Sequence, residues 1–372
     1  MAIVGAGLIG LALAFELAER GASVRVFDTR EPAKAASWAG AGMLAPITET
    51  IADAPMQAFC EASLLQYPDF VHRVREAGTV DPHLRLDGIL SAAYTPETFV
   101  GLRARAEAIA QSGHACEILD RASALAAEPA LGGHVCGALL VPDEGHVDNR
   151  RLGRALAAAC AARGVVVQTG LREVVVESDA RRILGVRTDN GFVPAGAAIN
   201  AAGAWASRVA GVREDCIPPV RPVKGQMLAL AIPRGFVRRT VWVPGAYFVP
   251  RADGRLLIGA TVEEAGFDVR VTAGGMHDLL HAASQAAPAL AGFAVSETWA
   301  GLRPGTPDGL PFIGPTALDG YFLATGHFRN GILLAPATAR LVADLLDGTA
   351  SDTPFELTDE RASQEARPNV AP

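Results

Sequence analysis

Three glycines near the amino terminus have the spacing of a dinucleotide-binding turn. The segment GAGLIG, residues 5–10, joins a short apolar run to a stretch with helical spacing. Glycines at these places allow a tight turn and a close approach of the backbone to a pyrophosphate, whose charge the helix N-terminus stabilises. Asp28 ends a second apolar run, where a carboxylate can accept hydrogen bonds from ribose hydroxyls. The pattern predicts a site for NAD or FAD, because an acidic residue here disfavours the 2′-phosphate of NADP.

A run of small residues follows, with the sequence SWAGAGMLAP at residues 37–46. Small side chains let a flat, bulky ring lie against the backbone, which an isoalloxazine requires more than a nicotinamide does. An ordinary flexible loop explains the same composition equally well. The run taken alone therefore leaves FAD and NAD open.

Arg303 and Tyr247 are candidates for holding a carboxylate. Arg303 lies in the segment GLRPG, residues 301–305. Its planar guanidinium offers two parallel donors to a carboxylate and does not lose its charge. Tyr247, in GAYFVP at residues 245–250, could add a hydroxyl donor. The alternative interpretations are a surface arginine and a tyrosine packed within a strand.

Other chemical patterns in the chain are weak. His277 and His281 are spaced to share one helix face, but an aspartate follows the first histidine and no third ligand is evident. We therefore expect no metal site. The five cysteines are widely spaced and form no C-x-x-C pair, which is typical of reduced thiols in a cytosolic protein.

Charge and hydropathy exclude several classes of partner. The formal net charge is −7, whereas nucleic acids and anionic membranes bind basic faces. No stretch reaches the roughly 18 uninterrupted apolar residues of a membrane span. We expect a soluble cytoplasmic protein that binds no nucleic acid.

The elements that must position these residues alternate along the chain. Strand, turn and helix patterns occur at residues 2–27, 149–167 and 321–346, with a further apolar run at 198–203, and more helices are expected near 62–77 and 96–111. Residues 218–303 are rich in alternating apolar segments, which indicates an antiparallel sheet. The sequence predicts an α/β fold in which a Rossmann-like domain is interleaved with an α+β domain built on an antiparallel sheet.

Several strings along the chain together resemble one enzyme family. They are GAGLIG, ASWAGAGMLAP, INAAGAWAS, RPVKGQ, TWAGLRPGTPDG and GHFRNGILLAPATARLVADLL. They are similar to the D-amino-acid-oxidase-type FAD-dependent oxidoreductases, and within that family to the glycine oxidases of thiamine biosynthesis. The resemblance extends from Met1 to about Leu346. Sarcosine oxidases and D-amino-acid dehydrogenases are similar too, so the strings identify the family more firmly than the substrate.

The resemblance implies a bound FAD and the residues that hold it. FAD would be non-covalent, because no cysteine lies near the Arg303 segment, where some sarcosine oxidases attach flavin. A helix starting near Asn330 would direct its positive end at the flavin pyrimidine edge. The implied cofactor residues are Gly5, Gly7, Leu8, Ile9, Gly10, Asp28, Thr29, Ala36, Ser37, Ala41, Gly42, Met43, Val174, Gly203, His327, Phe328, Arg329, Asn330, Gly331, Ile332 and Leu333.

The resemblance also implies the reaction. Arg303, Tyr247 and Arg329 would hold the carboxylate of a small amino acid while hydride passes from its Cα to flavin N5. Glycine would yield the imine, then glyoxylate and ammonia, with oxygen reduced to hydrogen peroxide. The imine, dehydroglycine, could instead supply a thiazole-synthesis enzyme. Gly245 and Val262 stand where relatives can carry larger side chains, which leaves sarcosine and small D-amino acids open as substrates.

Three alternatives accompany this expectation. A D-amino-acid dehydrogenase or a sarcosine-oxidase-like enzyme could use another electron acceptor, and a non-catalytic flavin-binding subunit is a third alternative. Family analogy suggests a homo-oligomer.

The FAD-binding domain would comprise residues 1–82, 145–220 and 301–350, and the substrate-binding domain 83–144 and 221–300. Residues 351–372 would form a partly disordered tail.

Overall fold

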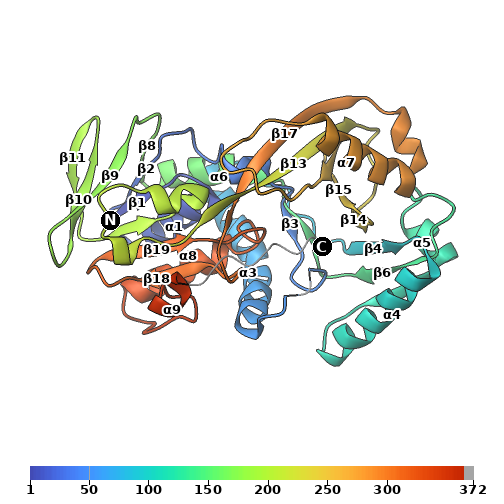
Figure 1. The fold of residues 1–372 in the computed structure, drawn as a ribbon, viewed down its shortest axis with the longest axis horizontal. Helices are drawn as coiled ribbons and strands as arrows, with labels where there is room; N and C mark the ends of the chain where they lie inside the picture. Colours follow the sequence, from blue (N-terminus) through green and yellow to red (C-terminus); the bar gives the residue numbers. More distant parts are fainter. Residues whose placement is uncertain (50, 364–372) are drawn as a thin grey trace.

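The computed structural model describes residues 1–49 and 51–363, which form two large sheets with helices packed around them (Figure 1). The six-stranded sheet lies in the left half of Figure 1 and the eight-stranded sheet in the right half. No helix within these described ranges combines the length and apolar character needed to cross a bilayer.

The six-stranded sheet is built from the beginning, middle and end of the chain. Its order is β18-β19-β12-β1-β2-β8, and every pairing is parallel except the one between β18 and β19. The strands are β1 (Ala2–Val4), β2 (Arg25–Phe27), β8 (Val166–Gln168), β12 (Ala198–Asn200), β18 (Phe312–Pro315) and β19 (Tyr321–Thr325). This parallel sheet confirms the expected Rossmann-like half of the fold.

Four helices accompany this sheet: α1 (Leu8–Glu19), α3 (Ala54–Gly78), α6 (Asn149–Ala162) and α8 (Ala335–Leu346). Helix α1 is apolar on almost every side because it is enclosed by α6, α8 and the sheet. Gly10 permits this packing, since a Cβ there would lie 1.9 Å from the Gly5 carbonyl oxygen. Helix α3 starts earlier than the sequence suggested, because the Asp53 side chain accepts a hydrogen bond from the Met56 N–H at 2.8 Å and caps the helix.

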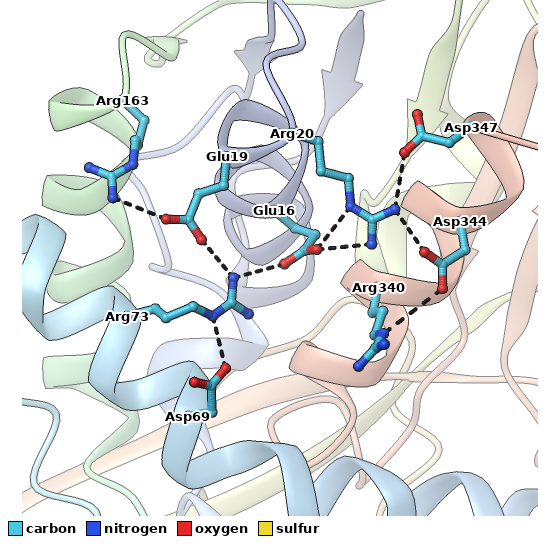
Figure 2. A network of polar contacts seen from close by, with 9 residues as sticks. All are labelled: Glu16, Glu19, Arg20, Asp69, Arg73, Arg163, Arg340, Asp344 and Asp347. Carbon is cyan, nitrogen blue, oxygen red and sulfur yellow. Dashed lines mark hydrogen bonds and ion pairs between the residues drawn. The ribbon is translucent and has the colours of Figure 1, made fainter. Parts of the chain in front are cut away.

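A cluster of charged side chains joins α1 to its neighbours (Figure 2). Arg73 of α3 contacts Glu16 at 3.2 Å and Glu19 at 2.6 Å, both on α1. Arg20, which follows α1, contacts Asp344 of α8 at 2.7 Å. These side chains are partly exposed, so each pair contributes little by itself. The cluster therefore links the end of α1 to α3 and α8, while burial of the apolar core supplies most of the free energy of folding.

The eight-stranded sheet has the order β17-β13-β16-β15-β14-β4-β6-β5. It is antiparallel except where β14 pairs with β4, which confirms the expected second sheet. Its strands are β4 (Ile89–Ala93), β5 (Glu117–Asp120), β6 (Gly137–Val141), β13 (Arg221–Ala231), β14 (Thr240–Val243), β15 (Ala246–Pro250), β16 (Arg255–Gly259) and β17 (Val295–Gly305). The helices of this half are α4 (Pro96–Gln111), α5 (Arg121–Ala127) and α7 (Ala273–Ala286).

Smaller elements complete the fold. A three-stranded antiparallel sheet, absent from the sequence expectations, lies beside the six-stranded sheet and turns tightly through Asp189 and Asn190, residue types common in hairpin turns. The remaining elements are β3 (Met43–Leu44), β7 (Gly145–His146), β9 (Val174–Ser178), β10 (Ile183–Thr188), β11 (Gly191–Pro194), α2 (Ala36–Ala39), α9 (Asp359–Ala362) and the 3₁₀ helices η1 (Gly203–Arg208), η2 (Glu214–Cys216) and η3 (Pro288–Gly292).

Residues 351–363 of the carboxyl-terminal segment pack against the rest of the protein. Phe355 is buried against Phe59, and Arg361 pairs with Asp308 at 2.7 Å. These contacts hold residues 351–363 to the six-stranded sheet, where the Ile313 N–H donates to the Phe355 carbonyl. Residues 364–372 of the expected tail lie outside the described residues.

We propose the interleaved two-domain division on the strength of these two sheets. Strand β17 crosses the boundary proposed at residue 301. Strand β17 continues past residue 301 to Gly305, and Arg303 pairs with Val223 of β13. Arg303 therefore lies on a strand of the eight-stranded sheet rather than in a loop of the FAD-binding half.

Candidate active site

A cavity of about 810 Å³ is lined by residues from both large sheets. It contains most of the residues expected from the sequence. Those that line it are Gly5, Gly7, Leu8, Ile9, Asp28, Thr29, Ala36, Ser37, Ala41, Gly42, Met43, Val174, Gly203, Tyr247, Arg303, His327, Phe328, Arg329, Gly331 and Ile332.

Three expected cofactor residues do not line this cavity: Gly10, Asn330 and Leu333. Gly10 instead serves helix packing, as described above. Leu333 is only 2% exposed and belongs to the apolar core. The expectation of a helix starting near Asn330 is wrong, because turns occupy residues 328–334 and α8 begins at Ala335. Phe328, Arg329, Gly331 and Ile332, which precede the helix, line the cavity in place of a first helical turn.

The glycine-rich turn is held by two side chains from other segments. Asp28 accepts hydrogen bonds from the N–H groups of Ala6 at 2.7 Å and Arg30 at 2.8 Å. Ser37 Oγ accepts one from the Leu8 N–H at 2.9 Å. Gly7 caps helix α1 without a side-chain hydrogen bond, so the positive helix end faces the cavity. Asp28 thus orders the turn as well as lining the expected ribose site.

The run of small residues is required by close packing beside the cavity. A Cβ on Gly42, whose φ is 74°, would lie 2.0 Å from the Val147 carbonyl oxygen. A Cβ on Gly301 would lie 2.4 Å from the Ala39 Cβ. The flexible-loop interpretation is therefore wrong for these positions, since their size is dictated by the segments they contact.

Arg303 is held in place by main-chain oxygens. Its Nη1 donates to the Thr261 carbonyl at 3.1 Å and to the Lys224 carbonyl at 3.4 Å. Gly225 provides the space, because a Cβ there would lie 2.3 Å from Nη1. Burial lowers the pKa of Arg303, and the neighbouring Tyr247 opposes that shift. Among the described residues no carboxylate forms an ion pair with Arg303 within 4.0 Å, which leaves the guanidinium able to bind an incoming one.

Tyr247 lies beside this guanidinium. It is on β15, and its hydroxyl lies 3.8 Å from the Met227 sulfur. Gly259 makes room for the phenol, since a Cβ there would lie 2.6 Å from the hydroxyl oxygen. Burial raises the pKa of Tyr247 and Arg303 opposes that shift, so the hydroxyl remains a hydrogen-bond donor in mildly alkaline solution. Arg303 and Tyr247 together form a compact donor pair at one part of the cavity.

Arg329 faces an acidic residue that the sequence analysis missed. Its Nε lies 3.9 Å from Oε2 of Glu49, whose side chain is 11% exposed, whereas that of Arg329 is 33% exposed. Burial raises the pKa of Glu49, and Arg329, Arg303 and Arg105 oppose the increase. The only sequence signal for Glu49 is its place just after the small-residue run.

Glu144 anchors the segment that carries Glu49. Its Oε1 accepts a hydrogen bond from the Thr48 N–H at 3.0 Å, and Arg105 donates to the Thr48 carbonyl. Burial raises the pKa of Glu144 to about 7, and the Thr48 and Ile47 hydrogen bonds oppose that increase. Two buried charged groups thus position the Glu49 backbone.

His327 is neutral in this structure. Its Nε2 lies 3.0 Å from the Thr338 hydroxyl, and burial lowers its pKa to about 3. A neutral imidazole bonded to α8 fits a structural role at the cavity wall. Among residues 1–49 and 51–363 no group of three or more His, Cys, Asp or Glu side chains is placed to hold a metal ion, and the rings of His277 and His281 stack on each other.

Comparison with known proteins identifies the family. A family model described as FAD dependent oxidoreductase matches residues 1–345. The chain belongs to this family. It is 37% identical over 364 residues to a glycine oxidase of Geobacillus kaustophilus, with 96% of each chain covered. A crystal structure of glycine oxidase from Geobacillus kaustophilus matches with a TM-score of 0.90 and 36% identity, covering 96% of this chain and 98% of that one.

A second kind of relative is longer. The Synechocystis bifunctional protein ThiO/ThiG is 38% identical over 351 residues, which cover 92% of this chain. The chain spans about half, 51%, of the length of that relative. The chain is thus a glycine-oxidase-like member of the FAD-dependent oxidoreductases.

The residues of the cavity fit the FAD that this oxidoreductase family uses. The turn at Gly5 and Gly7 and the positive end of α1 suit the pyrophosphate. Asp28 and Val174 line the same cavity and suit the adenosine. Gly40, Ala41 and Gly42 line the same cavity as Tyr247 and Arg303, and a wall without large side chains suits a flat ring.

We predict that Gly7→Val prevents FAD binding without unfolding the protein. Gly7 has φ −70° and ψ −179°, which valine tolerates, and the nearest atom to a Cβ there is Ser37 Oγ at 3.4 Å. The added methyl groups would fill the cavity beside the pyrophosphate. Visible absorbance per protein, with circular dichroism as the folding check, measures this.

Gly101→Val on exposed α4 is the matched control, because a Cβ there meets nothing within 4 Å. It should keep the yellow colour. A yellow Gly7→Val protein would contradict the placement of the pyrophosphate.

Proposed function

We propose that this flavoenzyme oxidises glycine, and also sarcosine or small D-amino acids, to the imine. The imine then hydrolyses to glyoxylate and ammonia in the case of glycine, and oxygen is reduced to hydrogen peroxide. The observation that carries the proposal is the donor pair of Arg303 and Tyr247 in the cavity that fits FAD. The similarity to glycine oxidases along nearly the whole chain supports it.

The donor pair fixes one end of the substrate. A carboxylate placed between the Arg303 guanidinium and the Tyr247 hydroxyl would receive charge-assisted hydrogen bonds in a partly enclosed cavity, where such bonds are stronger than in bulk water. Because Arg303 is itself held by the Thr261 and Lys224 carbonyls, the carboxylate is bound in one orientation. The substrate Cα is thereby presented at a constant position along the cavity wall.

FAD bound in the cavity would supply a two-electron acceptor for the Cα hydride and return the electrons to oxygen. No side chain needs to remove a proton if the substrate amine enters uncharged. Tyr247 stays protonated and His327 stays neutral, so neither changes its charge across the working range. The amine itself then sets the pH dependence, and activity rises toward alkaline pH.

The cavity wall beside the donor pair favours a small substituent. Gly245 and Val262 both line it, and Trp242 and Met227 add apolar surface. Neither Gly245 nor Val262 carries a large side chain at this wall, and Gly245 has φ 78° in a turn where a Cβ would contact Ala282 of α7 at 3.5 Å. We therefore include N-methyl and small D-amino acids in the proposed substrate range.

We also propose that FAD is held without a covalent bond, because no cysteine belongs to the described lining of the cavity. A role in supplying dehydroglycine for thiazole synthesis is proposed on the relatives named ThiO/ThiG. In that case a thiazole-synthesis enzyme is the partner. A homo-oligomer remains an expectation from family analogy.

The direct test is peroxide formation by the purified yellow protein with glycine, sarcosine and D-alanine. We expect turnover of at least one, increasing with pH. Arg303→Ala should lower kcat/KM by at least about a hundredfold, because a buried charged partner of the carboxylate is lost. No turnover of any of the three would refute the proposal, and turnover with an artificial acceptor but not with oxygen would favour the dehydrogenase alternative.

A second prediction concerns a variant that displaces the Arg303 side chain while the arginine itself is kept. In Gly225→Ala the new methyl group would occupy the place of the guanidinium, so Arg303 must shift. We expect KM for glycine to rise at least about tenfold with the FAD spectrum unchanged, equivalent to about 1.4 kcal/mol of binding.

The control for this variant is Gly274→Ala on α7, where a Cβ meets nothing within 4 Å. Its KM should stay at the wild-type value. An unchanged KM in Gly225→Ala would show that the position of Arg303 does not matter for binding.

A further inference from the structure

We propose that Glu49 is a specificity-determining residue that restricts the active site to substrates with a single carboxylate. The inference rests on the proposed function, since it assumes that Arg303 binds a substrate carboxylate. It adds a class of compound that the site rejects: amines that carry a second carboxylate close to the first.

Three charged side chains line the substrate end of the cavity: Glu49, Arg303 and Arg329. The other charged lining residues, apart from neutral His327, come from the end of β2 and its following turn, the start of β9 and η1, at the adenosine end. Glu49 pairs with Arg329 at 3.9 Å, and its carboxylate also interacts with Arg303. Burial raises the pKa of Glu49, so its carboxylate is favoured in alkaline solution, where the substrate end holds two cations and one anion.

This balance leaves one uncompensated positive charge, which one substrate carboxylate neutralises. A second carboxylate would bring the total to a net negative charge inside a partly enclosed cavity, where like charges repel more strongly than in bulk water. Glu49 already lies 3.9 Å from Arg329 Nε, so a second carboxylate at Arg329 would be repelled by Glu49 and would compete with it. Glycine, sarcosine and D-alanine carry one carboxylate and neutralise the single positive charge. Iminodiacetate and D-aspartate carry two carboxylates and would make the net charge negative.

Contacts from distant segments of the chain fix the position of Glu49. Glu144 and Arg105 fasten the Thr48 backbone immediately before it, from two segments distant in sequence. Arg105 is also the third guanidinium near Glu49, but it lies beside Glu144, which offsets its charge. The carboxylate of Glu49 is thus held toward Arg329 by an anchored segment of chain.

The test compares two non-reactive ethers bound to the FAD-containing enzyme at alkaline pH. Methoxyacetate carries one carboxylate and diglycolate carries two on a similar backbone, and each is titrated by the change in flavin absorbance. Wild type should bind methoxyacetate at least about tenfold more tightly than diglycolate. In Glu49→Gln this preference should fall by about tenfold or reverse, while Glu49→Asp retains it. Iminodiacetate turnover relative to glycine should rise in Glu49→Gln.

The matched control is Glu117→Gln, at an exposed position of β5 in the eight-stranded sheet. This change should leave the preference unchanged. The proposal is overturned if wild type binds the two ethers equally, or if Glu49→Gln keeps the wild-type preference. The wild-type comparison stands even if Glu49→Gln does not fold. Failure of the proposed function would instead appear as absence of glycine turnover by wild type, which the ether comparison does not require.

Discussion

The active site depends on a guanidinium held inside the protein by neutral oxygen atoms. A buried cation without a paired anion is costly, because its hydration is lost and carbonyl dipoles replace only part of it. Arg303 is in this situation, with two carbonyls as hydrogen-bond partners and a phenol beside it. The cost is recovered when a carboxylate binds, which makes the site selective for an anionic substrate.

The fold accommodates this cation by removing side chains around it. Gly225 clears the space for the guanidinium, Gly259 the space for the Tyr247 hydroxyl, and Gly301 the contact with Ala39. All three lie in strands of the eight-stranded sheet, where glycine has no side chain to pack and weakens the strand. The long pairing of β13 with β17 compensates for that weakness and keeps Arg303 in register.

Patterns local in sequence predicted much of this molecule. The glycine-rich turn, the apolar runs and the helix at residues 96–111 depend on neighbouring residues, and the structure confirms them. The longer strings also indicated the oxidoreductase family. What they missed arises from contacts between distant segments. Glu49 is a single acid in a polar stretch, and only the folded chain places it beside Arg329. Likewise, α8 begins only at Ala335, because the segment before it places Phe328, Arg329, Gly331 and Ile332 along the cavity, which helical spacing in the sequence does not reveal.

The central claim, that Arg303 receives the substrate carboxylate, is tested most directly by a crystal structure of the FAD-containing enzyme with acetate bound. The account predicts that the acetate oxygens lie within hydrogen-bond distance of the Arg303 guanidinium, with the Tyr247 hydroxyl donating to one of them. Acetate bound to Arg329 alone, with Arg303 still facing only the Thr261 and Lys224 carbonyls, would contradict it.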